Sequence, residues 1–214
     1  MRSFAMLLAA VVLVTPAMAF MPAPYIGANL QVNSPTGNFS ETDIANDEGG
    51  AKTGLGGEVD VGITVGGGSV YLGYRFGKHD ADAKYDVGGE IIETSGEWSI
   101  NRWVLGGRLH ILGNTPLPVV PTVGGGVTMG KTDVSAKGSV GENSIDRTET
   151  SDNAFGWFLE LGALLKPPGP LSLIGNVQYH SFDADYQSQL YDGKVNVAFF
   201  TFQIGARLAL GPTA

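Results

Sequence analysis

Apolar or small residues occupy every second position of the stretch FFTFQIGARLAL at residues 199–210. Phe200 and Phe202 lie in one phase of this pattern, whereas Gln203 and Arg207 lie in the other. Successive side chains of a β-strand point to opposite faces of the sheet, so a period of two predicts a strand with one apolar and one polar face.

The same alternation recurs along the chain and is interrupted by clusters of Gly, Pro, Asn and Asp. The predicted strands are residues 24–32, 56–65, 69–77, 98–112, 119–130, 154–165, 171–181 and 196–210. The short connections are 66–68, 113–118 and 166–170, and the long polar ones are 33–55, 78–97, 131–153 and 182–195. Long and short connections alternate strictly. Because consecutive connections of an up-and-down barrel emerge at opposite rims, we predict a single all-β domain, an up-and-down antiparallel eight-stranded barrel.

The polar face of these strands is a sparse mixture of Gly, Thr, Asn and Gln with a few charged residues: Glu58, Asp60, Arg75, Arg102, Arg108, Glu160 and Arg207. A soluble barrel of the lipocalin type would turn its polar face to water and would carry many Lys and Glu residues there. Small residues with isolated charges suit instead the crowded interior of a narrow barrel. We therefore predict that the polar face lines the lumen.

Isolated charges inside a barrel must pair or reach water. The expected pairs join Glu58 or Asp60 with Arg75 or Arg102, and Glu160 with Arg207 or Arg108. A gated ion path is the functional alternative to an internal network that fills the lumen, and we favour the network.

The apolar face carries aromatic residues near the strand ends that lead into the long connections: Tyr74, Phe76, Trp103, Phe155, Trp157, Tyr179 and Phe200. Aromatic residues gather in this way at the interface between membrane and water. The apolar face should therefore meet lipid, with short periplasmic turns and long extracellular loops. Backbone polar groups cannot be left unpaired in hydrocarbon, so the sheet must close.

The first residues read MRSFAMLLAAVVLVTPAMA. A basic residue, Arg2, precedes an apolar run, and Ala17-Met18-Ala19 supplies a small-x-small cleavage signature. The apolar run is much shorter than the about 20 residues of a membrane-spanning helix, which disfavours a membrane anchor. We expect a cleaved signal peptide at residues 1–19 and an exported barrel domain at 20–214.

Composition excludes several classes of function. Charged residues make up 16% of the chain, below the roughly 25% of soluble domains. The chain has no Cys, so neither a disulfide framework nor a thiolate metal site is possible. The formal net charge of −8 argues against nucleic acid as a partner.

The sequence resembles the small eight-stranded outer-membrane barrels of the OmpA/OmpX type. YLGYRFG at residues 71–77 and AFGWFLELGALL at residues 154–165 are similar to strands of that group. The last strand resembles the family's assembly signal through Gln203, Gly205, Leu208 and Leu210, although the final residue of the family pattern is usually aromatic and terminal. The resemblance implies insertion by the outer-membrane assembly machinery of a Gram-negative-type bacterium.

Two motifs could carry chemistry. Some small outer-membrane barrels are lipid A-modifying enzymes, and QYHSFDAD contains His180 next to Ser181. Adjacent strand residues face opposite sides, so these two cannot form a hydrolytic dyad. KHDADAKYD contains Asp80, Asp82 and Asp86, but it lacks the ligand spacing and late Glu of a calcium loop. We predict no catalytic residues, no metal and no cofactor.

We therefore expect a non-enzymatic integral outer-membrane barrel whose acidic surface-exposed loops serve envelope integrity, adhesion or surface recognition. The expected partners are outer-membrane lipid, lipopolysaccharide and the assembly machinery, and the extracellular partner stays open. A narrow pore for small solutes, a lipid A-modifying enzyme and a soluble periplasmic barrel are the alternatives.

Overall fold

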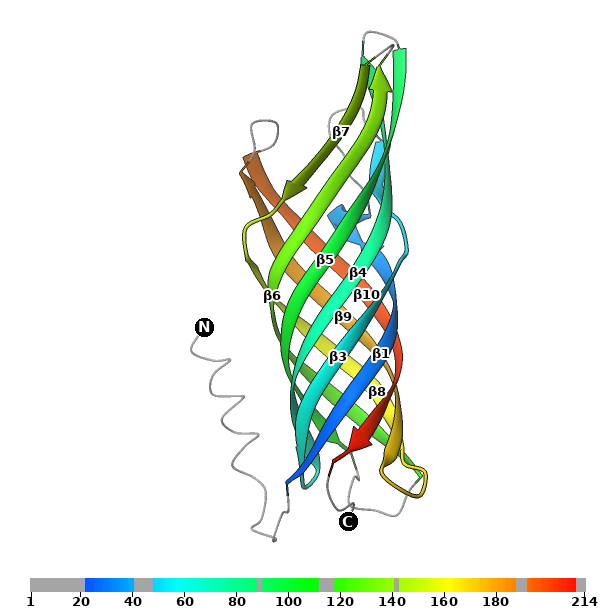
Figure 1. The fold of residues 1–214 in the computed structure, drawn as a ribbon, viewed down its shortest axis with the longest axis vertical. Helices are drawn as coiled ribbons and strands as arrows, with labels where there is room; N and C mark the ends of the chain where they lie inside the picture. The colour runs from blue at the N-terminus through cyan, green and yellow to red at the C-terminus, as the bar shows by residue number, and fades with distance from the viewer. Residues whose placement is uncertain are drawn as a thin grey trace.

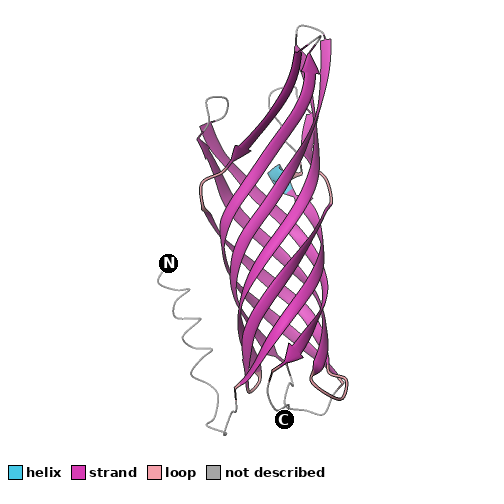
Figure 2. Cartoon of the chain, in the orientation of Figure 1, coloured by secondary structure: helices cyan, strands magenta, loops and turns pink. Residues whose placement is uncertain are grey.

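The computed structural model describes residues 22–40, 48–87, 90–111, 118–140, 143–187 and 192–210. Secondary structure in these ranges is β-strand apart from one short 3-10 helix (Figure 2). The elements are β1 (Ala23–Thr36), η1 (Gly37–Phe39), β2 (Glu48–Ala51), β3 (Gly54–Val65), β4 (Gly68–Val87), β5 (Glu90–His110), β6 (Val119–Val140), β7 (Asn143–Thr150), β8 (Ala154–Leu165), β9 (Leu171–Gln187) and β10 (Asp192–Ala209). No helix in the described ranges is long and apolar enough to cross a membrane.

Eight of these strands form a closed ring in which each is antiparallel to two neighbours (Figure 1). β1 closes the ring because it pairs with β3 on one side and with β10 on the other. β2 pairs with β4, and β7 pairs with β6, beyond the ring. The structure thus confirms the predicted all-β, antiparallel eight-stranded barrel.

The segments expected to be long loops are in large part strands. β4 and β5 stay paired from Gly68–Leu109 to Val87–Glu90, which spans nearly all of residues 78–97. β6 pairs with β7 within residues 131–153, and β9 pairs with β10 as far as Gln187–Asp192. In most of these segments the alternation continues with its phases reversed. In β9, for example, Phe182, Ala184 and Tyr186 are buried inside, whereas Asp183 between them is exposed. The apolar outward phase therefore ends while the backbone hydrogen bonds continue. Figure 1 shows the β4 to β7 strands rising beyond the rest of the barrel.

Two of the predicted short turns lie within the described ranges. Gly66, between β3 and β4, has φ 55°, and Gly169, between β8 and β9, has φ 110°. Only glycine adopts such values without strain, so these residues allow the chain to reverse tightly. The third short connection, at 113–118, lies almost wholly outside the described residues.

The two phases of each strand face different surroundings. Outward-facing Leu30 is 73% exposed and Ile204 is 69% exposed. Their neighbours in the opposite phase, such as Gln31 and Gln203, are buried inside the ring. The outer surface is therefore apolar and the lumen contains the polar side chains, as expected for a barrel in lipid.

Candidate functional site

The middle of the lumen contains a buried ion pair between β3 and β4. Glu58 lies directly opposite Arg75 in the strand register, and the two side chains form a salt bridge. Arg75 also donates to Gln178 Oε1 at 2.7 Å and lies 2.6 Å from Nε2 of His180. One arginine from β4 therefore connects β3 with β9 across the lumen.

A second buried ion pair joins Arg108 of β5 to Glu160 of β8. Glu160 Oε2 also accepts hydrogen bonds from Gln178 Nε2 at 2.8 Å and from the Tyr71 hydroxyl at 3.4 Å. Because Gln178 contacts Arg75 as well, it links the two ion pairs into one network. Both pairs are among the combinations expected from the sequence.

The three other charged residues of the lumen make no ion pair with the described residues. Asp60 accepts a hydrogen bond from Asn29 at 3.2 Å. Arg207 lies over the ring of Tyr25, with 4.7 Å between Cζ and the ring centroid. Arg102 donates to Thr128 and to backbone carbonyls, so the expected set of charges lies inside the barrel but is only partly paired.

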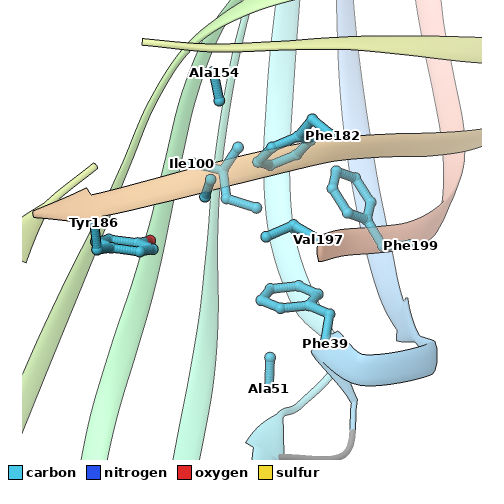
Figure 3. Close-up of a cluster of buried hydrophobic side chains, with 9 residues drawn as sticks. Phe39, Ala51, Ile100, Ala154, Phe182, Tyr186, Val197 and Phe199 are labelled. Carbon is cyan, nitrogen blue, oxygen red and sulfur yellow. The ribbon is translucent and has the colours of Figure 1, made fainter. Parts of the chain in front are cut away.

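The end of the lumen beside the long hairpins, which we expect to face outward and call the extracellular end, is apolar. A cluster of buried side chains fills it: Phe39, Ala51, Ile100, Ala154, Phe182, Ala184, Tyr186, Val197 and Phe199 (Figure 3). We call this set the aromatic cluster. Phe39 reaches it from η1, and its ring lies 5.2 Å from that of Trp98 and 6.4 Å from that of Phe199. The cluster was not predicted, although Phe182 and Phe199 have the inward phase of His180 and Thr201.

The opposite end of the lumen, beside the short turns and expected to face the periplasm, contains a smaller apolar cluster of Val120, Leu164 and Ile174. Ser69 and His110 lie 3.4 Å apart in the same half of the barrel. Large side chains therefore occupy the lumen at both ends as well as in the middle. This arrangement leaves little space for a solute path through the described part of the barrel.

Outward-facing aromatic side chains contact one another on the outer surface. Tyr74 and Trp103 lie opposite each other with ring centroids 5.2 Å apart. Tyr179 lies 5.6 Å from Trp157 and 5.2 Å from Phe200. Phe76 and Phe155, which complete the predicted aromatic belt, are also exposed on the outside. Their height relative to a bilayer stays a prediction.

His79 belongs to β4 beyond Phe76, on the extracellular side of this belt. Its Nδ1 lies 2.9 Å from the carbonyl oxygen of Lys52, and its ring contacts Phe39 at 5.3 Å. Burial lowers the pKa of His79. His79 therefore holds the chain between β2 and β3 against the aromatic cluster.

The outer membrane protein beta-barrel domain is the family whose model matches residues 4–210. This chain belongs to that family. The match confirms the resemblance drawn from the sequence and identifies the protein as an outer-membrane β-barrel.

Solved structures show the same fold. Neisserial surface protein A is 14% identical, with a TM-score of 0.53 over 86% of this chain and 96% of that chain. The outer membrane protein OprG from Pseudomonas aeruginosa is also 14% identical, with a TM-score of 0.54 over 89% of this chain and 96% of that one. No curated protein sequence matches this chain. Identities this low support the fold and carry no information about residues.

The predicted assembly signal lies on β10 and just after it. Gln203 and Gly205 face the lumen, whereas Leu208 and Leu210 are exposed on the outer surface. A Cβ atom on Gly205 would come within 2.5 Å of the Ala28 carbonyl oxygen, so this position has no space for a side chain. The packing requirement at Gly205 is independent of any role in assembly, and that role stays a prediction.

The residues considered for chemistry are not arranged as a catalytic site. The ring of His180 is stacked between Phe158 at 5.5 Å and Phe199 at 4.9 Å. Ser181 is in register with outward-facing Trp157 and so lies on the other face of β9. Among described residues no group of three His, Cys, Asp or Glu could hold a metal ion. The side chains of Asp82 and Asp86 lie outside the described residues.

Proposed function

We propose that this outer-membrane barrel is a non-enzymatic, non-conducting protein that presents its hairpins at the cell surface, for envelope integrity, adhesion or surface recognition. The observation that carries the proposal is the filled lumen. The aromatic cluster lies above the network of Arg75, Gln178 and Glu160, and a further apolar cluster lies below it. An eight-stranded barrel is just wide enough for side chains to fill it.

The hairpins beyond the barrel support the surface role. Their outer faces carry short-range polar pairs, including Lys78 with Glu97 at 2.8 Å and Asn196 with Asp183 at 2.8 Å. Paired strands are stiffer than irregular loops, so each hairpin offers a defined surface to an extracellular partner. Acidic residues outnumber basic ones in these segments, which disfavours polyanions as that partner.

Planar-bilayer recording of the purified, refolded protein tests the filled lumen. We expect no steady channels at potentials that reveal conduction in a porin used as the positive control. Large, stable conductance steps would contradict the proposal and favour the narrow pore. Arg75→Ser and Phe199→Ala, each on its own, should remain closed because the other layer of side chains remains.

A lipid-modifying enzyme is the other alternative. His180 is buried against two aromatic rings and bonded to Arg75, which opposes a role as a general base towards a lipid outside the barrel. Mass profiles of lipid A from cells with the protein, without it and with His180→Ala should be identical. A difference that depends on His180 would overturn the non-enzymatic proposal.

The proposal also includes export through cleavage after Ala19 and contact with lipopolysaccharide. N-terminal sequencing of the membrane-extracted protein should begin at Phe20. The folded protein should be extracted only with detergent and should migrate differently on gels before and after boiling. Release without detergent would favour the soluble barrel.

A further inference from the structure

The buried charges of the lumen do not balance. Among described residues the lumen contains the arginines Arg75, Arg102, Arg108 and Arg207, but only the carboxylates Glu58, Asp60 and Glu160. A buried charge without a counter-charge is strongly unfavourable in an environment that excludes water. Among the described residues one positive charge therefore lacks a counter-charge, and the strand register points to Arg102.

Two of the four arginines form ion pairs, and a third, Arg207, lies across a glycine from the remaining carboxylate. Arg75 pairs with Glu58, and Arg108 pairs with Glu160. Gly27 lies between Asp60 and Arg207 in the strand register, and the Asp60 carboxylate lies over Gly27, where a side chain would otherwise be. Asp60 therefore lies over β1, next to the strand of Arg207, although no contact joins the two side chains and Nε and Nη2 of Arg207 have no hydrogen-bond partner among the described residues. Arg102 differs from Arg207 because no carboxylate lies over its neighbours in the register without already being paired.

Arg102 is 2% exposed. Its neighbours in the register do not neutralise its charge. Its partner in the register on β4 is Arg75, another cation, and its partner on β6 is Gly130, which has no side chain. His180, neutral or charged, adds no negative charge nearby. Arg102 therefore has a cation and no carboxylate beside it in the register.

The contacts of Arg102 satisfy only one side of its guanidinium. Nε donates to Thr128 Oγ1 at 3.1 Å, and Nη2 donates to the carbonyl oxygens of Ala154 at 2.7 Å and Thr128 at 3.3 Å. The ring of Phe182 lies beneath Cζ at 3.6 Å. Nη1 has no hydrogen-bond partner among the described residues. These dipoles and this ring stabilise the cation but do not neutralise it.

We propose that Arg102 binds a small monovalent inorganic anion, of the size of chloride, at Nη1 inside the lumen. One uncompensated charge calls for one negative charge, and a single open donor group beside Phe182 suits a weakly hydrated halide. A phosphate or sulfate would bring two charges and would need more donors than Arg102 offers. The bound anion makes the lumen electrically neutral and completes its filling.

Bromide provides the direct test because it replaces chloride and scatters anomalously. Crystals of the wild-type protein grown with sodium bromide should show an anomalous peak within hydrogen-bonding distance of Arg102 Nη1. Lys78→Met, which removes an exposed cation, should keep the peak, and Arg102→Met should lose it. A wild-type crystal without a peak at Arg102 overturns the proposal, and so does a peak that persists in Arg102→Met.

Thermal unfolding provides an independent test in solution. At constant ionic strength, replacing gluconate with chloride should raise the unfolding temperature of the wild-type protein and should saturate, because a ligand that binds only the folded state stabilises it. Arg102→Met should show no such dependence. A chloride effect of equal size in wild type and Arg102→Met would contradict a site at Arg102. If Arg102→Met does not fold, Arg102→Gln and the wild-type bromide data decide the question.

Discussion

The middle and the extracellular end of the lumen are built from the same strands in the same phase, yet different interactions fill them. In the middle, Arg75, Gln178 and Glu160 connect β4, β9 and β8 through charges and hydrogen bonds. At the extracellular end, Phe182 and Phe199 pack with Phe39 instead. The comparison shows that an inward-facing position can be occupied by a polar or by an apolar side chain. We expect lipid to surround the middle, where a network of ion pairs and hydrogen bonds is sealed from water, and we expect the end, which is closed by apolar packing, to lie near water.

Breaking one buried ion pair in the middle of the lumen should cause the largest loss in the free energy of unfolding. Glu160→Gln leaves Arg108 without its counter-charge, which should lower the free energy of unfolding by about 3–5 kcal/mol. Urea unfolding in phospholipid vesicles, followed by tryptophan fluorescence, measures the loss. Glu160→Gln combined with Arg108→Met should recover most of it, because no charge is then left unpaired. A single-variant loss under about 1 kcal/mol would mean that the pair is well hydrated.

Truncating a side chain of the aromatic cluster should cause the second-largest loss in the free energy of unfolding. Phe199 is 2% exposed inside the lumen, and the next residue, Phe200, is 42% exposed on the outer surface. Phe199→Ala creates a cavity and should cost about 3 kcal/mol, whereas the gap left by Phe200→Ala can be filled by lipid and should cost under about half as much. The same unfolding assay compares the two. Equal losses would contradict the assignment of Phe199 to a packed interior.

Replacing glycines by alanine should distinguish the inner face from the outer face with a smaller change in the free energy of unfolding. Gly205→Ala forces a Cβ against a backbone oxygen and should cost about 1–3 kcal/mol. Gly175, on the outer surface, has its nearest atom 3.9 Å from such a Cβ, so Gly175→Ala should be neutral or stabilising by under about 1 kcal/mol. Both are measured by unfolding in vesicles. A more harmful Gly175→Ala would reverse the assigned faces of β9 and β10.

The smallest effect is expected on the hairpins. Lys78 and Glu97 form an ion pair with both side chains substantially exposed. Solvent screens such a pair, so Lys78→Ala should change the free energy of unfolding by under about 1 kcal/mol, with less effect at high salt. A larger loss would indicate that the hairpins stabilise the barrel rather than project from it.

The alternation of apolar and polar residues was sufficient to predict the barrel, its eight strands and the lumen charges, because one face of each strand meets lipid. Glu58 or Asp60 could be expected to pair with Arg75 or Arg102 because these residues lie on consecutive strands, and the contacts select Glu58 with Arg75. The alternation was misleading where its phases reverse. From Lys78 onward the outward phase of β4, which carries Phe76 lower down, carries charged residues such as Lys78 and Asp80, so the apolar outward pattern ends and the sequence suggests a loop although the strand continues.

The aromatic cluster could not be predicted for a related reason. Phe182 and Phe199 follow polar inward residues in phase, but an apolar residue in a polar segment can as well face a partner or another loop. Phe39 comes from η1, which no periodicity could identify. The absence of a carboxylate beside Arg102 depends on which side chains meet across the lumen, and only three-dimensional contacts reveal it.

The central claim is that the apolar phase of each strand faces lipid and the polar phase faces the lumen. Because the chain has no Cys, single cysteines can be introduced to measure this directly. Single-cysteine variants Ile204→Cys and Gln203→Cys, each carrying a nitroxide label, can be compared in bilayers by their collisions with dissolved oxygen. The account predicts frequent collisions at residue 204, in lipid, and strong protection at residue 203, inside the barrel. Frequent collisions at residue 203 with protection at residue 204 would contradict it.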